Sequence, residues 1–85
     1  MSQVPTLQLI TKAHREGFAA LCDRVAAALS AGVPLVQWRD KQTSDAEAVR
    51  QVRALKLLCV SHGARLIVND RLDIALAAGA DGVHL

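Results

Sequence analysis

The chain has 85 residues, of which 52% are hydrophobic and 21% are charged. This balance excludes an intrinsically disordered chain, and the length allows one domain at most, since domains typically have about 100 to 150 residues. The net charge is +2, with charges of both signs interspersed. Without a basic run or an apolar stretch of about 18 residues, we expect neither a nucleic acid nor a membrane as a partner.

The first forty residues carry the pattern of a strand, a helix and a second strand. Residues 7–11 (LQLIT) are short and mostly apolar and follow Pro5, as expected of a buried strand. Apolar residues recur at helical spacing over residues 18–31, and Gly32 follows where a left-handed helix end is common. Residues 34–39 (PLVQWR) predict a second strand that is apolar first and polar at its end.

A second helix is predicted to begin at a capping box over residues 44–47 (SDAE). In such a box the Ser44 hydroxyl and the Glu47 carboxylate satisfy exposed backbone N–H groups. Apolar residues then keep the 3.6-residue period until Gly63. The helix also carries cations on its other face, which we expect to be solvated: Arg50, Arg53 and Lys56.

The remaining residues continue the alternation. They predict a strand over 65–69 (RLIVN), a short helix over 72–78 closed by Gly79, and a strand over 82–85 (GVHL). Strands that alternate with helices form parallel sheets with right-handed crossovers. Most strand starts are spaced by roughly the ~30 residues of one unit of an eight-unit barrel.

We therefore predict an α/β fold, the first half of a (β/α)₈ TIM barrel with four parallel strands and three helices. A flavodoxin-like or Rossmann sheet is the alternative fold. No G-x-G-x-x-G turn follows the first predicted strand, so the usual dinucleotide signature is missing.

The two cysteines indicate the compartment of the protein. Cys22 and Cys59 form no C-x-x-C pair, and each falls within an apolar helical pattern. This favours buried free thiols over a disulfide or a metal site. Disulfides are rare in the reducing cytosol, so we expect a cytoplasmic protein.

Polar side chains follow the apolar part of the second predicted strand. Gln37, Arg39 and Lys41 alternate, and side chains two apart share one face of a strand. An arginine fork and a lysine charge suit phosphate oxygens, and a glutamine can bond a heterocycle. The alternative is that Arg39 and Lys41 only solvate a loop and pair with nearby aspartates. Trp38 points to the other face, where we expect it to pack under a helix.

A second polar group, Asn69-Asp70, follows the third predicted strand. A carboxylate at this end of a parallel sheet can hold Mg²⁺, which binds through one or two carboxylates together with waters and substrate phosphates. The alternative is a plain turn or helix cap. Arg71 and Asp73 read as an exposed pair in the first helical turn, and His84 is a secondary candidate in the last strand.

Four segments in this order resemble thiamine phosphate synthase: 9–11 (LIT), 32–41 (GVPLVQWRDK), 66–71 (LIVNDR) and 77–85 (AAGADGVHL). Thiazole tautomerases share the barrel and the last segment, but Gln-x-Arg-Asp-Lys followed by Asn-Asp is more similar to the synthase. The resemblance implies condensation of 4-amino-2-methyl-5-hydroxymethylpyrimidine diphosphate with hydroxyethylthiazole phosphate, which yields thiamine phosphate and pyrophosphate.

The resemblance also implies roles for particular residues. Asp70 matches a position that ligates Mg²⁺, and no covalent nucleophile is required of the protein. Five residues match positions that bind the pyrimidine diphosphate: Gln37, Arg39, Asp40, Lys41 and Asn69.

Two features depart from the family pattern. Lys12 follows the first predicted strand where an acid is common, at a position to which we assign no role. The second magnesium ligand and the thiazole-phosphate site of the family correspond to segments that would follow Leu85.

We therefore expect residues 1–85 to form the N-terminal part of such an enzyme, inactive alone and self-associating through open barrel edges. The rival hypotheses are a thiazole-tautomerase-like enzyme and a non-catalytic half-barrel that binds phosphate and self-associates.

Overall fold

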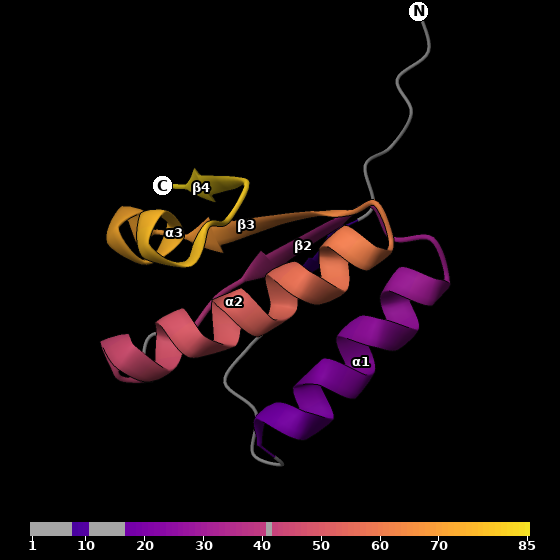
Figure 1. Ribbon diagram of the computed structural model, residues 1–85, viewed down its shortest axis with the longest axis horizontal. Coiled ribbons are helices and arrows are strands. Elements are labelled where there is room, and N and C mark those ends of the chain that lie inside the picture. Colours follow the sequence, from indigo (N-terminus) through magenta and orange to yellow (C-terminus); the bar gives the residue numbers. More distant parts are fainter. Residues whose placement is uncertain (1–7, 11–16, 41) are drawn as a thin grey trace, which may run out of the picture.

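A computed structural model describes residues 8–10, 17–40 and 42–85. Its elements follow the predicted order of strands and helices (Figure 1). They are β1 (Gln8–Ile10), α1 (Phe18–Ser30), β2 (Leu35–Trp38), α2 (Asp45–Ser61), β3 (Arg65–Asn69), α3 (Leu72–Ala78) and β4 (Gly82–His84). The bounds of β3 and α3 agree with the sequence, whereas β2 begins after Pro34 and ends before Arg39.

The strands form one parallel sheet in the order β1-β2-β3-β4. The register pairs Trp38 with Val68 and Val68 with Val83, so that one row of side chains crosses three strands. Every strand lies beside its neighbour in the sequence, without the reversal of strand order of a Rossmann sheet. The prediction of a parallel α/β fold with four strands and three helices is confirmed for the described residues.

One face of the sheet is covered by the helices. α2 packs against β2 and β3, with α1 and α3 on its two sides (Figure 1). The side chains of β2 and β3 that point to these helices are at most 1% exposed: Val36, Trp38, Leu66 and Val68. Leu35 and Ile67, which alternate with them, are only half-buried. The core therefore lies between the sheet and its helices. The other face of the sheet carries the side chains that alternate with the core residues along each strand.

The ends of the helices follow local sequence rules. The Ser44 hydroxyl accepts a hydrogen bond from the Glu47 backbone N–H at 3.3 Å, as the capping box predicts. The reciprocal bond of the box does not form, because the Glu47 carboxylate accepts from Arg50 and Gln51 instead. Gly79 ends α3 with φ of 75°, a left-handed conformation in which a side chain would be strained.

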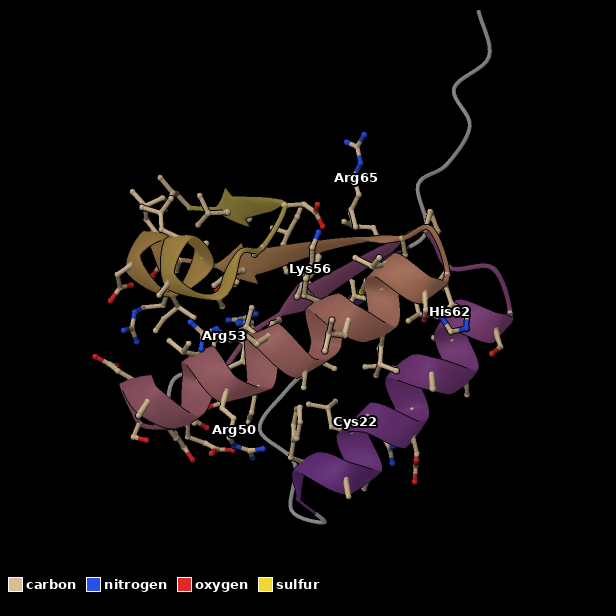
Figure 2. All side chains as sticks on the ribbon, in the orientation of Figure 1. Cys22, Arg50, Arg53, Lys56, His62 and Arg65 are labelled. Atoms are coloured by element: carbon tan, nitrogen blue, oxygen red, sulfur yellow. The ribbon has the colours of Figure 1, made fainter. Side chains whose placement is uncertain are left out.

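The three cations of α2 lie outside the core, as the sequence predicts, with Arg50 and Arg53 exposed, and each of the three also contacts a residue outside the helix (Figure 2). The Arg50 guanidinium lies 5.5 Å from the ring centre of Phe18 on α1. Arg53 donates a hydrogen bond to a backbone carbonyl of α3, and Lys56 pairs with Asp81 at 2.6 Å. These partners are distant in sequence, so helical periodicity places the cations outside the core without predicting their contacts.

No helix among the described residues is both long and apolar enough to cross a membrane. This agrees with the absence of a long apolar run in the sequence. The two cysteines in the described part of the chain are free thiols, as the sequence predicts; Cys59 is buried, whereas Cys22, also expected to be buried, is only half-buried. Burial raises the pKa of both thiols.

Candidate functional site

The carboxyl ends of β2 and β3 bring two predicted site residues together. Asn69 donates a hydrogen bond from its amide nitrogen to the Gln37 amide oxygen at 2.9 Å. Gln37 is only 7% exposed, although it lies on the sheet face opposite the helices. The bond joins side chains 32 residues apart. A pair of side-chain amides therefore stands at the edge of the sheet where ligands bind in parallel α/β folds.

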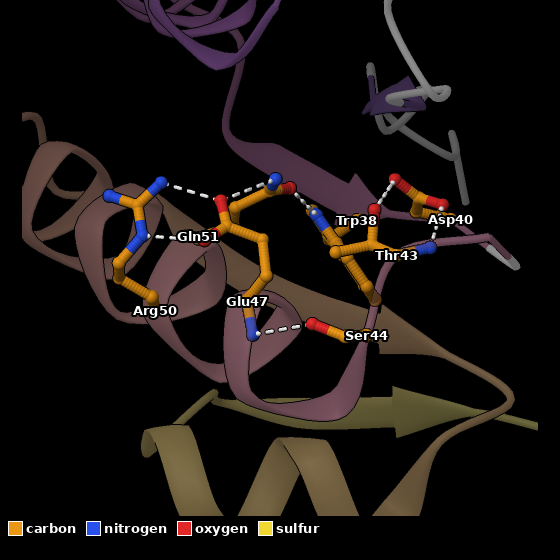
Figure 3. Close-up of polar contacts among 7 residues, drawn as sticks. All are labelled: Trp38, Asp40, Thr43, Ser44, Glu47, Arg50 and Gln51. Atoms are coloured by element: carbon orange, nitrogen blue, oxygen red, sulfur yellow. Dashed lines mark hydrogen bonds and ion pairs between the residues drawn. The ribbon is translucent and has the colours of Figure 1, made fainter.

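The Trp38 side chain lies on the helix side of the sheet at the end of β2, as the alternation of side chains along the strand predicts. Its side chain is 1% exposed, and its indole N–H donates to the Gln51 amide oxygen at 3.2 Å. Gln51 in turn donates to Glu47 at 3.0 Å, and Arg50 binds the same carboxylate (Figure 3). Hydrogen bonds from Arg50 and Gln51 lower the pKa of Glu47 to about 2. With Trp38 turned to the core, its neighbour Gln37 faces the other side of the sheet.

The Asp40 carboxylate organises the loop that follows β2. It accepts hydrogen bonds from the backbone N–H and the hydroxyl of Thr43 (Figure 3) and from the backbone N–H of Gln42. Partial burial raises the pKa of Asp40, but these hydrogen bonds outweigh it and leave the pKa below its ordinary value. Asp40 therefore stays ionised near neutral pH and sets the shape of the loop.

Of the two predicted phosphate-binding cations, the structure describes one. Arg39 follows the last residue of β2 and is exposed. Lys41 lies outside the described residues. The binding roles of Arg39, Asp40 and Lys41 stay predictions.

A pocket of about 210 Å³ opens at the same edge of the sheet. Its described lining consists of Asp40, Asn69, Asp70 and Arg71. Three of these four residues are predicted site residues, and they come from the exits of two different strands. The loop after β2 and the turn after β3 therefore line the same pocket.

Asp70 has an unusual backbone conformation in this turn. Its φ is 60°, the only positive φ of a residue other than glycine in the described part of the chain. Its N–H donates to the His84 carbonyl oxygen of β4 at 2.7 Å, while its side chain is exposed. Aspartate tolerates the left-handed region better than most residues, yet the conformation remains disfavoured. His84, the secondary candidate, contributes its backbone here, and its side chain is exposed.

The donor set at the pocket suits a weakly held hard cation. No group of three histidine, cysteine or acidic side chains is arranged for a metal among residues 17–40 and 42–85. Asp70 offers one carboxylate, and Asn69 adds an amide beside it. Mg²⁺ is commonly bound by one or two carboxylates while keeping waters and substrate phosphates. These residues fit such an ion, and its binding stays a prediction.

Arg71 is a pocket residue that the sequence reasoning did not select. Its fork binds Asp73 through two hydrogen bonds of 3.0 and 2.9 Å, as the predicted first-turn pair. It also donates to Asp45 at 2.9 Å. These hydrogen bonds, first to Asp73 and then to Asp45, raise the pKa of Arg71. The only sequence signal for its place in the pocket is its position directly after Asn69-Asp70.

Comparison with known proteins identifies the family. The sequence profile described as thiamine monophosphate synthase matches residues 7–85. The chain is 47% identical over 83 residues to a thiamine-phosphate synthase of Albidiferax ferrireducens, covering 98% of this chain and 38% of that protein. It is 57% identical over 65 residues to a thiamine-phosphate synthase of Parasynechococcus marenigrum, covering 76% and 19%.

A solved structure agrees with these sequence matches. Thiamine phosphate pyrophosphorylase from Pyrococcus furiosus superposes with a TM-score of 0.80 at 30% identity, covering 94% of this chain and 39% of that one. The chain thus spans less than two fifths of the length of each of these relatives. With its profile match, its sequence identity and its fold in agreement, the chain belongs to the thiamine monophosphate synthase family.

Proposed function

We propose that these 85 residues are the N-terminal part of a thiamine phosphate synthase, and that they supply its pyrimidine-diphosphate and magnesium sites. The observation that carries the proposal is the pocket in which Asp40, Asn69 and Asp70 meet at the carboxyl edge of the sheet. It stands where the ligands of parallel α/β folds bind, in a chain of the synthase family.

The architecture supports the first half of a (β/α)₈ barrel. Four consecutive parallel strands lie side by side, and the buried hydrophobic side chains of β2 and β3 all face the helices. In a barrel of this kind the other face lines the interior and is closed by four further strands. Leu35 and Ile67 lie on that face and are half-buried here.

The proposed reaction joins the pyrimidine diphosphate to the thiazole phosphate. The bond from the pyrimidine methylene carbon to the diphosphate breaks, and a bond from that carbon to the thiazole nitrogen forms, with pyrophosphate leaving. Gln37 and Asn69 would orient the pyrimidine substrate, and Arg39 and Lys41 would bind its diphosphate oxygens. Mg²⁺ held at Asp70 would stabilise the charge that develops on the departing pyrophosphate. No step uses a nucleophilic side chain.

The test is turnover by the complete protein that contains this segment. With both substrates and Mg²⁺, we expect thiamine phosphate and pyrophosphate in equal amounts, measured by chromatography. A chelator should stop the reaction, and added Mg²⁺ should restore it. No turnover of the diphosphate combined with tautomerisation of a thiazole phosphate would replace the proposal with the tautomerase hypothesis.

The location that we propose is the cytoplasm. Both cysteines of the described chain are free thiols, and Cys59 is fully buried in the core. Reduced buried thiols are typical of a reducing compartment. Fractionation of cells followed by detection of the protein in the cytosolic fraction tests this assignment.

A further inference from the structure

The turn between β3 and α3 controls where the Asp70 carboxylate points. β3 ends at Asn69 and α3 begins at Leu72, so that only Asp70 and Arg71 connect them. Asp70 occupies the left-handed region with φ of 60°, and its N–H is bonded to the His84 carbonyl oxygen. In so short a connection, the backbone angles of these two residues determine both the start of α3 and the direction of the Asp70 side chain.

Arg71 is held on both sides by carboxylates from different elements. Its Nε and Nη2 atoms bond the two oxygens of Asp73 in the first turn of α3, at 3.0 and 2.9 Å. Its Nη2 atom also bonds Asp45, the first residue of α2, at 2.9 Å. The Arg71 side chain is 34% exposed, whereas those of Asp45 and Asp73 are 75% and 65% exposed. The guanidinium therefore ties together the starts of two helices at the edge of the pocket.

These contacts restrict the orientation of the Arg71 side chain more than they raise the free energy of unfolding. Exposed ion pairs are weak because solvent and salt screen them. A planar arginine fork that binds one carboxylate with two parallel bonds nevertheless restricts orientation, which a single lysine charge does not. No cap from a side chain fixes the N-terminus of α3. The backbone of the turn is bonded at Asp70, whose N–H donates to a carbonyl oxygen of β4, and at Arg71, whose carbonyl oxygen accepts the Ala75 N–H at 3.0 Å. The contacts with Asp45 and Asp73 add a restraint on the Arg71 side chain.

We propose that Arg71, held by Asp45 and Asp73, is a positioning residue that keeps the Asp70 carboxylate at the pocket in the orientation needed to bind a divalent cation. The inference rests on the proposed function, because it assumes that Asp70 is the cation ligand. Arg71 itself is committed to the two carboxylates, and its task is distinct from binding the diphosphate. Partners that orient a metal ligand typically change metal affinity by about 10- to 100-fold when they are removed.

The experiment compares variants of the complete protein. Mn²⁺, in the presence of inorganic pyrophosphate, is titrated and followed by electron paramagnetic resonance, and the Mg²⁺ concentration for half-maximal turnover is measured separately. We expect Arg71→Ala to weaken Mn²⁺ binding about tenfold and to raise the half-maximal Mg²⁺ concentration equally. The maximal rate at saturating Mg²⁺ should change about twofold or less, because the carboxylate ligand itself remains. Arg71→Lys, which keeps the charge but lacks the fork, should also lose affinity.

The matched control is Arg53→Ala. Arg53 also joins α2 to α3, through a hydrogen bond of 3.1 Å to the Ala77 carbonyl oxygen, but at the far end of α3 from the pocket. It should leave Mn²⁺ affinity unchanged. The exposed variant Asp45→Asn, which keeps the size of the side chain, should reproduce part of the Arg71→Ala effect.

The outcomes separate this inference from the proposed function. Mn²⁺ affinity that is normal in Arg71→Ala and lost in Asp70→Ala would overturn the positioning role and leave the metal site intact. Normal affinity in Asp70→Ala would overturn the metal site and the positioning role together. Equal losses in Arg71→Ala and Arg53→Ala would show general loosening of the two helices and would also overturn the positioning role.

Discussion

The two ends of the sheet use aspartates in opposite ways. At the amino end, Asp81 bonds Lys56 at 2.6 Å and accepts the Leu66 backbone N–H at 2.7 Å, while its own N–H donates to the Leu66 carbonyl oxygen. At the carboxyl end, Asp70 has a disfavoured backbone and an exposed side chain beside a pocket. The first aspartate completes a hydrogen-bond network, whereas the second is exposed and lines the pocket.

This contrast agrees with the general division of parallel α/β folds. The amino ends of the strands serve stability and the carboxyl ends serve binding. A residue whose polar groups are all bonded within the fold contributes to folding, while a carboxylate held in a strained turn is typical of a functional position. Variants at the two ends should therefore separate the free energy of unfolding from activity.

The largest effect is expected when residues 1–85 are produced by themselves. β1 and β4 then have unpaired outer edges, and Leu35 and Ile67 lie on a face that no described element covers. A few hundred Å² of exposed apolar surface corresponds to about 5 to 10 kcal/mol, comparable with the stability of a domain. We expect the polypeptide to associate and to lack synthase activity. Light scattering checks this, and a monodisperse monomer would contradict it.

The next largest effect separates activity from stability at Asp70. In the complete protein, Asp70→Gly should lower Mg²⁺-dependent turnover by about 100-fold or more, because the proposed cation site would lose its carboxylate. Glycine accepts a φ of 60° without strain, so the free energy of unfolding should stay the same or rise by about 1 kcal/mol. Asp70→Ala should lose activity without that gain. Denaturant unfolding and turnover assays check both, and an active Asp70→Gly variant would break the contrast between the two ends.

A smaller effect is expected from the predicted diphosphate-binding cations. Arg39→Ala and Lys41→Ala should each weaken binding of the pyrimidine diphosphate by about 10- to 100-fold, since each removes a charge-assisted bond to phosphate. Affinity for the thiazole phosphate should change little. Calorimetry with each substrate measures this, and Arg24→Ala, on the exposed part of α1, is the charge-matched control. Equal losses for both substrates would contradict the assignment.

At the amino end, Asp81→Ala should lower the free energy of unfolding by about 1 to 2 kcal/mol, because the Leu66 N–H and Lys56 lose their acceptor. The half-maximal Mg²⁺ concentration should not change. Asp23→Ala, on the exposed face of α1, is the control for loss of a negative charge. A change in the half-maximal Mg²⁺ concentration of Asp81→Ala would contradict the separate roles of the two ends of the sheet.

The smallest expected effect is the pH dependence of the contribution of Asp81 to the free energy of unfolding. Burial raises the pKa of Asp81, but the bonds from Lys56 and the Leu66 N–H outweigh it, and the pKa in the folded state is lowered. The unfolded chain therefore takes up the proton first as the pH falls. The stabilisation is complete above the unfolded pKa of about 3.9 and is lost as the pH falls through the lower folded value. Unfolding measured from pH 6 to pH 3 should show the wild type and Asp81→Ala converging, and a constant difference would contradict this.

Local sequence was sufficient to predict the elements and much of the candidate site. Patterns within about four residues predict the order of strands and helices and the bounds of β3 and α3. They also predict the Ser44 cap and the burial of Trp38 on the helix side of the sheet. The period of two places Gln37 on the face opposite Trp38, and parallel strands bring it beside Asn69. The family resemblance, which adds the roles of these residues, is confirmed at the level of the family.

Tertiary structure alone decided which charged groups meet. Arg71 bonds Asp45 across 26 residues, Asp81 accepts the Leu66 N–H across 15, and Arg50 lies over Phe18. Periodicity determines which side of an element a residue occupies, but not the rotation and spacing of separate elements, which depend on how their side chains pack. The left-handed backbone of Asp70 likewise depends on the contact with β4. For this reason the sequence identified the aspartate, while the fold determined its left-handed turn and the contacts of the arginine that follows it.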